Sequence, residues 1–292
     1  MKLSVVIPAH NEEGSIGRTV ESLALTLERE SIPYEIVVVA DHCADGTAAE
    51  VLRVGERHSG VRAIENQRSG GFGYAVRAGL DAYTGDAVAI MMADLSDSPE
   101  DLITYYRLLE RGFDCAFGSR FMPGARVTDY PKLKLLMNRF VNFGIRLMFR
   151  HGYNDTTNAF KAYRRDVVDN VQPLLSAHFN LTVELPLKAL VRGHSYAIVP
   201  VSWTNRVAGE SKLKLQEMGS RYAFIVLYIL LEHLLSGGDY HRGRIAKWRE
   251  RRRSMRPWQR ADQLPGAARP DDGGDGLQQD REIQEDRPAL EI

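Results

Sequence analysis

The chain has 292 residues, enough for one large hydrophobic core or two small ones, and its composition is that of an ordinary globular protein. Its 38 Lys and Arg residues balance 38 Asp and Glu residues, so the formal net charge is zero and gives no overall reason to expect binding to nucleic acid. The two cysteines, Cys43 and Cys115, lack the spacing of metal ligands or of a disulfide framework, and we therefore expect a reducing, cytoplasmic compartment.

The first residues, Lys2 to Pro8, predict a strand and lack the apolar stretch and cleavage site of a secretory signal, so export is not expected. The longest apolar run, Ala223 to Leu231, is interrupted by Glu232 and His233. It is much shorter than the ~20 residues that a membrane-spanning helix needs. We therefore expect that the protein does not span a bilayer.

Strand-forming and helix-forming segments alternate from Leu3 to about residue 118. The predicted strands are Leu3 to Ile7, Tyr34 to Val39, Val61 to Glu65, Asp86 to Met92 and Asp114 to Phe117. Such alternation is typical of βαβ units and predicts an α/β fold with a mostly parallel sheet flanked by helices. Ligands of such sheets gather at the carboxyl ends of the strands.

Polar residues follow the first two predicted strands. Pro8, His10, Asn11 and Glu12 come after the first strand, and Asp41 comes after the second, each in a turn that leads into a helix. Backbone N–H groups and short polar side chains at helix N-termini can hold the base, ribose or phosphate of a nucleotide. The same residue types are also ordinary helix caps, so each turn taken singly favours capping.

A glycine-rich segment follows the third predicted strand. It contains Gly71 and Gly73, which would let the backbone approach a ligand closely. The segment lacks the spacing of a P-loop, so the sequence does not indicate a P-loop NTPase.

The fourth predicted strand ends abruptly in an acidic turn that contains Asp94 and Asp97, and Pro99 then begins a helix. Two carboxylates three residues apart at a strand end can hold a hard divalent ion, which in turn neutralises the phosphates of a substrate. The alternative is a plain helix start with Asp97 or Ser98 as the N-cap. These residues alone do not decide between the two interpretations.

Taken together and in order, the motifs resemble family 2 glycosyltransferases, and within them the dolichyl-phosphate mannosyltransferase-like branch, over roughly residues 3 to 215. The stretches that carry the resemblance are Ser4–Glu12, Val37–Asp41 with Asp45–Thr47, Gly71–Ala75 with Gly79, Ala93–Leu95 with Pro99 and Glu100, Gly118–Arg120, Asp155–Arg164, Gly193–Tyr196, Val199–Val201, Arg206, Gly209 and Ser211–Leu213.

The resemblance implies a Rossmann-like GT-A fold over residues 1–215 that passes a sugar from a GDP- or UDP-sugar to a polyprenyl or dolichyl phosphate, usually with inversion and with Mg²⁺ or Mn²⁺. Asp41 then matches the position that contacts the base, and Asp94 matches the metal-binding aspartate of an Asp-x-Asp motif. The donor-binding residues that it implies are Pro8, His10, Asn11, Glu12, Asp41, Gly71, Gly73, Ala93 and Asp94.

The same resemblance assigns roles to three cations. Arg206 and Lys212 match residues of a loop that folds over the donor phosphates, and with Asp94 they are the expected catalytic residues. Arg120 matches an arginine of the acceptor-phosphate site, to which we add Arg139.

Two positions depart from the family pattern. Ala40 stands where the family has an acid before Asp41, and Met92 stands where the family has the first aspartate of its metal motif. A thioether is a poor ligand for Mg²⁺ or Mn²⁺. Either Asp97 supplies the missing carboxylate, or the donor diphosphate holds the ion more weakly, or the chain is an inactive descendant.

Two helices are candidates for contact with a membrane surface. Residues 132–150 are apolar and basic with no acid, which fits either an anionic membrane or a core helix with solvated cations. Residues 216–240 are predicted to form a second, interfacial helix. Residues 241–292 form a tail that is first basic, with Trp248 and Trp258, then acidic and largely disordered.

The expected partners are therefore a nucleotide sugar, a polyprenyl phosphate and the cytoplasmic face of a membrane, where the protein would be peripheral. An alternative is transfer to a saccharide hydroxyl, which would need a carboxylate base such as Asp155 or Glu184. A second alternative is a protein that binds a nucleotide sugar without turnover. The sequence identifies neither the sugar, the nucleotide nor the oligomeric state.

Overall fold

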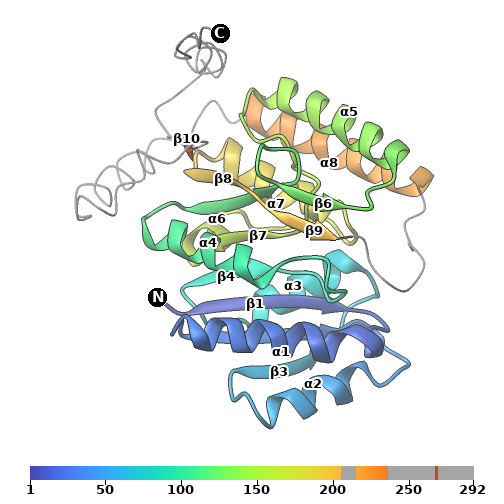
Figure 1. Cartoon of the computed structure of the whole chain (residues 1–292). Coiled ribbons are helices and arrows are strands. Elements are labelled where there is room, and N and C mark those ends of the chain that lie inside the picture. Colours follow the sequence, from blue (N-terminus) through green and yellow to red (C-terminus); the bar gives the residue numbers. More distant parts are fainter. Residues whose placement is uncertain (205–214, 236–266, 269–292) are drawn as a thin grey trace, which may run out of the picture.

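The computed structural model describes residues 1–204, 215–235 and 267–268, and it is built around one large sheet with helices on both faces (Figure 1). The helices are α1 (Glu13–Arg29), α2 (Thr47–Gly55), α3 (Phe72–Ala82), α4 (Pro99–Glu110), α5 (Lys132–Phe149), α6 (Arg165–Asn170), α7 (Leu181–Val191) and α8 (Leu215–Leu235). The strands are β1 (Leu3–Ala9), β2 (Tyr34–Ala40), β3 (Val61–Glu65), β4 (Ala87–Ile90), β5 (Cys115–Ser119), β6 (Arg126–Thr128), β7 (Lys161–Arg164), β8 (Tyr196–Pro200), β9 (Ser202–Thr204) and β10 (Ala267–Ala268).

The strands of the main sheet lie in the order β10-β8-β5-β7-β4-β1-β2-β3. The pairs β1–β2, β2–β3, β1–β4 and β5–β8 are parallel, whereas β7 runs antiparallel between β4 and β5. The short strands β6 and β9 form a separate parallel pair. The predicted α/β fold with a mostly parallel sheet is therefore confirmed.

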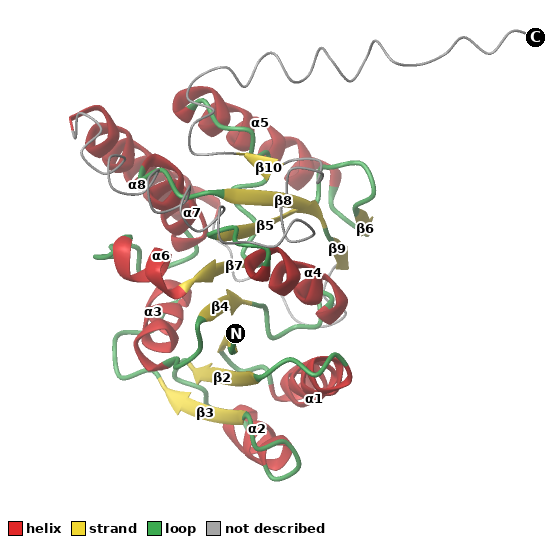
Figure 2. Cartoon of the chain, turned by 90° about the vertical axis from the view of Figure 1, so that its left-hand side faces the viewer, coloured by secondary structure: helices red, strands yellow, loops and turns green. Residues whose placement is uncertain are grey.

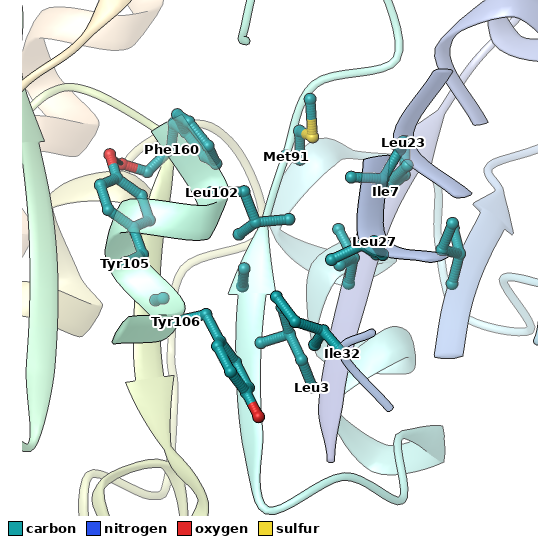
Figure 3. Close-up of a cluster of buried hydrophobic side chains, with 14 of the residues drawn as sticks. Leu3, Ile7, Leu23, Leu27, Ile32, Met91, Leu102, Tyr105, Tyr106 and Phe160 are labelled. Atoms are coloured by element: carbon teal, nitrogen blue, oxygen red, sulfur yellow. Dashed lines mark hydrogen bonds between the residues drawn. The ribbon is translucent and has the colours of Figure 1, made fainter. Parts of the chain in front are cut away.

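Each face of the sheet has its own apolar core. Helices α1, α2 and α4 cover one face, and α3, α6 and α7 cover the other (Figure 2). On the first face, Leu23 and Leu27 of α1 meet Leu102 and Tyr105 of α4 over the strands (Figure 3). Because side chains of both strand faces are buried, the central strands read as continuous apolar runs, as in Val5 to Ile7.

The fourth strand is shorter than the sequence predicts. It ends at Ile90, because the backbone N–H of Met92 no longer joins the sheet and donates a hydrogen bond to Asp97 Oδ2 at 3.0 Å. The acidic turn therefore begins directly at the sheet edge. Helix α4 begins at Pro99 as predicted, with Ser98 at the N-cap position.

Helices were predicted near 132–150 and 216–240, and the structure has α5 and, up to Leu235, α8 in these stretches; the two lie side by side at one end of the molecule (Figure 1). Helix α8 packs on α7, and the two share a small core with Ile145 of α5. In the part of the chain that the structure describes, no helix is both long and apolar enough to cross a membrane. Of the predicted tail, the structure describes only Ala267 and Ala268, which pair with β8.

Candidate active site

The acidic turn after β4 places two carboxylates at the carboxyl edge of the sheet. Asp94 is partly exposed, and its Oδ1 accepts a hydrogen bond from Ser96 N at 3.2 Å. Leu95 has a positive φ of 61°, which turns the chain sharply between them. Asp97 is buried except for 7% of its surface, and Met92 N donates to it. The turn therefore presents Asp94 outward and holds Asp97 behind it.

The electrostatics of this turn favour a nearby cation. Burial raises the pKa of the Asp97 carboxyl to about 7, and the charge of Asp94 adds to the effect. A divalent ion beside the two groups would favour their ionised forms. Among the described residues, however, no cluster of three or more His, Cys, Asp or Glu side chains could hold a metal by itself. Mg²⁺ commonly binds one or two carboxylates together with substrate phosphates, so a metal at this turn would need further ligands, such as those of a diphosphate.

Asp41 joins the turns that follow three different strands. Its Oδ1 accepts a hydrogen bond from Asn66 Nδ2 at 2.7 Å, and its Oδ2 accepts one from Gly71 N at 2.8 Å. His10 Nδ1 lies 2.5 Å from the backbone oxygen of Asp41, and Asn11 Oδ1 accepts a hydrogen bond from Ala44 N at 2.8 Å. The structure thus brings together the predicted donor-binding residues of the first three strand ends.

Two predicted donor residues have a more structural setting. Pro8 is buried within β1, paired with Val39, because the strand continues to Ala9 instead of ending at Ile7. Glu12 occupies the N-cap position of α1, where its backbone N–H donates to Thr47 Oγ1 at 2.9 Å. Pro8 therefore lies in the sheet and not in the turn where the sequence placed it.

The glycines of the third strand end are closely approached by the chain's own backbone. Gly71 has φ 150°, and a Cβ on it would lie 2.6 Å from the carbonyl oxygen of Ala177. A Cβ on Gly73 would clash with the carbonyl oxygen of Ser176. Sequence reasoning missed this loop, residues 176–178, which follows α6 and walls the predicted nucleotide site. Its only local signal was the pair of glycines that it packs against.

Aromatic stacking next to the loop of residues 176–178 holds the loop in place. The rings of Phe72 and Phe179 stack with centroids 4.2 Å apart, and Tyr74 N donates to the Ala177 carbonyl at 3.2 Å. The ring of His178 lies against the position that a Cβ of Gly71 would occupy. His178 therefore lies beside Gly71, one of the glycines predicted to bind the donor.

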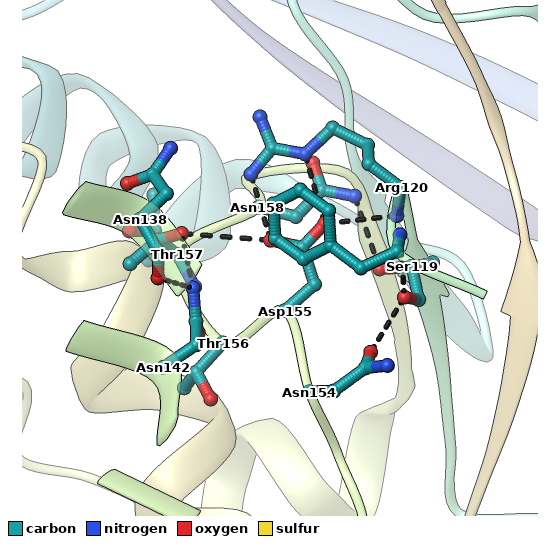
Figure 4. Close-up of polar contacts among 12 residues, drawn as sticks. Ser119, Arg120, Asn138, Asn142, Asn154, Asp155, Thr156, Thr157 and Asn158 are labelled. Carbon is teal, nitrogen blue, oxygen red and sulfur yellow. Dashed lines mark hydrogen bonds and ion pairs between the residues drawn. The ribbon is translucent and has the colours of Figure 1, made fainter. Parts of the chain in front are cut away.

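On the other side of the acidic turn, Arg120 forms a buried ion pair with Asp155 (Figure 4). Arg120 Nη2 donates to Oδ1 at 2.7 Å, while Nε and the backbone N of Arg120 donate to Oδ2 at 2.8 and 2.9 Å. Asp155 is fully buried. Nη1 takes no part in this pair, and the Arg120 side chain, which is 9% exposed, lines a groove.

Arg120 and Arg139 line the same groove, whose volume is about 600 Å³. The other lining residues are Phe121, Met122, Pro123, Val127, Tyr130 and Leu135. The guanidinium of Arg120 lies 5.5 Å from the ring centres of Phe121 and Tyr130, and that of Arg139 lies 5.2 Å from the Phe121 ring. Two cations with an apolar and aromatic lining suit an anionic group that is attached to an apolar chain.

The groove and the acidic turn are neighbours. Trp203 of β9 forms a β-bridge with Asp97, and its ring lies 5.0 Å from that of Tyr130 in the groove. Thr204 N donates to the Ser96 carbonyl at 3.2 Å. The predicted phosphate-binding residues Arg206 and Lys212 follow Thr204 and lie outside the described residues.

Both carboxylates that the sequence suggested as bases are buried and bind other groups of the chain. Asp155 is occupied by Arg120, as described above. Glu184 is also fully buried, where its two oxygens accept hydrogen bonds from Leu175 N and Ser176 N at 2.7 Å each and one oxygen lies 2.9 Å from Lys188 Nζ. The structure gives both carboxylates the role of fixing backbone and cations.

Comparison with known proteins agrees with this geometry. The family model for glycosyl transferase family 2 matches residues 4–172. Polyprenol monophosphomannose synthase of Mycolicibacterium smegmatis is 31% identical over 219 residues, which cover 72% of this chain and 80% of that protein. Dolichol-phosphate mannosyltransferase of Pyrococcus furiosus is 31% identical over 218 residues, which cover 73% of this chain and 60% of that protein.

A solved structure with the same fold is glucosyl-3-phosphoglycerate synthase from Mycobacterium tuberculosis in complex with Mn²⁺, uridine diphosphate and phosphoglyceric acid. It superposes with a TM-score of 0.60 at 18% identity, over 80% of this chain and 78% of that one. At this low identity the likeness concerns the fold alone, and it confirms the predicted GT-A architecture.

Proposed function

The chain belongs to glycosyl transferase family 2 and is a glycosyltransferase, and we propose that it transfers a sugar from a GDP- or UDP-sugar to a polyprenyl phosphate with inversion. The observation that carries the proposal is the groove of Arg120 and Arg139, which is cationic at one end, apolar along its walls and adjacent to the acidic turn. The names of the two relatives, a polyprenol monophosphomannose synthase and a dolichol-phosphate mannosyltransferase, support the same acceptor class.

The donor is assigned to the three linked strand ends. Asp41 is proposed to accept a hydrogen bond from the base, and its link to His10 beside it supports this. The diphosphate would then lie towards Asp94 at the next strand end of the same edge. When bound, Mg²⁺ or Mn²⁺ would be held by Asp94 and Asp97 and would supply positive charge to the leaving diphosphate.

The setting of Asp155 and Glu184, the two carboxylates that the sequence suggested as bases, supports a phosphate acceptor. A phosphate monoester has a second pKa of about 6, so most of the acceptor is already a dianion at neutral pH and no proton has to be removed. Transfer to a sugar hydroxyl would need a base. Asp155 and Glu184 are both occupied, which favours the phosphate acceptor over the hydroxyl acceptor.

The chain's own residues then have two tasks, alignment and charge stabilisation. Arg120 and Arg139 bind the acceptor phosphate and orient one of its oxygens towards the sugar. Arg206 and Lys212, beyond Thr204, are proposed to neutralise the charge that develops on the departing diphosphate. The nucleophile and the leaving group thus carry negative charge at opposite ends of the reacting centre, and cations face both.

A membrane surface is the proposed location, because a polyprenyl acceptor is fixed in one. On α5, Phe140 is 77% exposed and Leu136 is 68% exposed, and on the neighbouring α8, Phe224 is 65% exposed. The alternative of a core helix does not fit such exposure on α5. Apolar faces with flanking cations bind peripherally at the headgroup level, and we propose the cytoplasmic face.

The test offers a radiolabelled panel of GDP- and UDP-sugars to the purified protein, once with a polyprenyl phosphate in detergent and once with oligosaccharides. We expect one donor to label the lipid and none to label the saccharides. Labelling of a saccharide alone would establish the hydroxyl-acceptor alternative. Nucleotide binding by calorimetry without any labelled product would establish a binding protein without turnover.

The metal assignment has its own test. Asp97→Ala should raise the Mn²⁺ or Mg²⁺ concentration needed for half-maximal transfer, since it removes the carboxylate that stands in for the missing first aspartate. An unchanged metal requirement would show that Asp97 does not replace the aspartate that is absent at position 92.

A further inference from the structure

Lys161 lies in an unusual place for a lysine, the middle of the main sheet. It begins β7, where it pairs with Ile90 of β4 on one side and with Phe117 of β5 on the other. Only 1% of its surface is exposed. Burying an ammonium group is costly unless its N–H donors are satisfied, so the surroundings of Nζ must compensate.

The compensation comes from three backbone carbonyls. Nζ donates to the oxygens of Thr156 and Thr182 at 3.0 Å each, and also to the oxygen of Asn158. The ring of Tyr153 lies 5.7 Å from Nζ. Among the described residues no carboxylate forms an ion pair with Lys161. The three N–H donors of Nζ therefore all bind backbone carbonyls, and these hydrogen bonds fix the backbone in position.

The charges around Lys161 belong to the active site. Burial lowers the pKa of the ammonium to about 7, the charge of Asp155 opposes this, that of Arg120 adds to it, and that of Asp97 opposes it. The charge of Lys161 thus interacts both with the ion pair of the groove and with Asp97 in the acidic turn. The observed set of three carbonyls matches the three donors of the protonated form.

Two of the three carbonyls belong to the loop that carries Asp155 (Figure 4). On one side of this loop Asp155 holds the guanidinium of Arg120, and on the other Asn158 Nδ2 donates to the Gly118 carbonyl at 3.1 Å. The third carbonyl, that of Thr182, belongs to the first turn of α7. The ammonium therefore fastens the Asp155 loop between the sheet and α7.

We propose that Lys161 is a positioning residue for the acceptor phosphate, because its three hydrogen bonds fix the loop of Asp155 and thereby the guanidinium of Arg120. The inference rests on the proposed function in that it takes the Arg120 groove as the acceptor site. Lys161 itself is buried and touches neither substrate. On the proposed donor side, by contrast, Asp41 is fixed directly by the hydrogen bonds that it accepts from Asn66 and Gly71.

The test compares Lys161→Met with the wild type. Met has a similar length and no donor, so it keeps the volume and removes the three hydrogen bonds. We expect the KM for polyprenyl phosphate to rise about tenfold or more, as for the loss of several buried hydrogen bonds. The Kd for the nucleotide sugar should stay within about twofold by calorimetry. Amide hydrogen exchange of residues 154–160 should become faster.

A matched control separates this effect from a general loss of stability. Glu35→Gln removes a buried, hydrogen-bonded ionised group at the opposite edge of the sheet, where Glu35 accepts hydrogen bonds from Ser4 and Thr84. It should lower the melting temperature and leave the acceptor KM and the exchange of residues 154–160 unchanged. If Lys161→Met does not fold, Lys161→Gln, which keeps an amide donor, should show the same shifts to a smaller extent.

The failure of the inference can be told from the failure of the proposed function. A folded Lys161→Met protein with unchanged acceptor KM and unchanged exchange would overturn the positioning role, while wild-type transfer to the lipid would leave the proposed function standing. A wild type that labels no lipid would sink the proposed function and, with it, the acceptor role of Lys161. An equal rise in the acceptor KM and the donor Kd would also overturn the inference.

Discussion

The two halves of the sheet build their parts of the site by different means. Before residue 98, the site consists of polar residues at strand ends that are fixed by single hydrogen bonds, such as those of Asp41 to Asn66 and Gly71. After residue 98, it consists of a buried ion pair, Arg120 with Asp155, and an apolar groove beside exposed helices. The first arrangement suits a polar, water-soluble ligand, and the second suits an anion on an apolar chain.

The difference also concerns energy. A hydrogen bond to a charged group such as the Asp41 carboxylate contributes about 1.5–3 kcal/mol, whereas removing one partner of a buried ion pair costs about 3–5 kcal/mol, because the other charge is left unpaired. We call the part of the site before residue 98 the donor half and the part after it the acceptor half, after their proposed ligands. Loss of a single contact in the donor half is therefore expected to cost less stability. The acceptor half depends on Asp155 and on the loop that carries it.

The largest effect is expected at the acidic turn, where the two halves meet. Asp94→Ala should reduce transfer roughly a thousandfold, since it removes the carboxylate that is proposed to hold the metal beside the leaving diphosphate. Initial rates with labelled donor measure this loss. Asp81→Ala removes an exposed carboxylate that pairs with Arg68, and it is the control that should keep the wild-type rate. Equal losses in the two variants would contradict the role of Asp94.

The next largest effect is expected in the acceptor half. Asp155→Asn should lower the free energy of unfolding by about 3–5 kcal/mol, because Arg120 then lacks its counter-charge. Transfer should fall roughly a hundredfold through the acceptor, while nucleotide-sugar binding is kept. Denaturant unfolding and calorimetry measure the two quantities. If Asp155→Asn weakened the binding of the nucleotide sugar as much as that of the acceptor, the two halves would not be separate.

A smaller effect is expected on the exposed face of α5. Replacing Phe140 and Phe143, which are 77% and 65% exposed, by Ser should weaken binding to anionic vesicles by roughly 1–2 kcal/mol, or about 5- to 30-fold, without changing nucleotide affinity. Leu52→Ser on α2, where Leu52 is 62% exposed in the donor half, is the matched control. Vesicle co-sedimentation gives the answer, and an equal loss in both proteins would place the membrane surface elsewhere.

No effect on transfer is expected for a change at Glu35, which lies near the start of β2 in the donor half. Burial by itself raises the pKa of Glu35, but hydrogen bonds from Ser4 and Thr84 and the charge of Lys2 outweigh it and lower the pKa to about 2. A carboxyl with a lowered folded pKa stabilises the fold above its unfolded pKa and loses this contribution as the pH falls to 2.

Glu35→Gln should therefore lower the melting temperature at pH 7, where up to about 3 kcal/mol is at stake. The difference from the wild type should shrink between pH 4.5 and pH 2. Thermal unfolding across that range measures it. A melting-temperature difference that does not depend on pH would mean that the ionised form of Glu35 is not what stabilises this edge.

The donor half was largely readable from the sequence. Its strands are continuous apolar runs and its polar residues stand at the strand ends, so both the sheet and the cluster around Asp41 follow from local patterns. The extent of the strands was less predictable, because β1 includes Pro8 and β4 stops where Met92 turns towards Asp97.

The acceptor half was less readable, because its key contacts join residues far apart in the chain. The sequence assigned Arg120 to a phosphate and Asp155 to a possible base, and only the fold pairs them. Strand β7 has a charged residue, Lys161, in the core, which is the reverse of the usual strand signal. The loop that packs on Gly71 lies about a hundred residues later and left no pattern of its own.

The separation of the two halves can be measured directly by the binding of each ligand to a variant of each half. Titration calorimetry would use the nucleotide sugar found in the donor panel and a short-chain, water-soluble polyprenyl phosphate. Asp41→Ala should lose the nucleotide sugar and keep the lipid phosphate. The double variant Arg120→Met with Asp155→Asn, which leaves no buried charge unpaired, should do the reverse. If either folded variant lost both ligands, the site would not be divided between the two halves. The same would follow if both variants still bound both ligands.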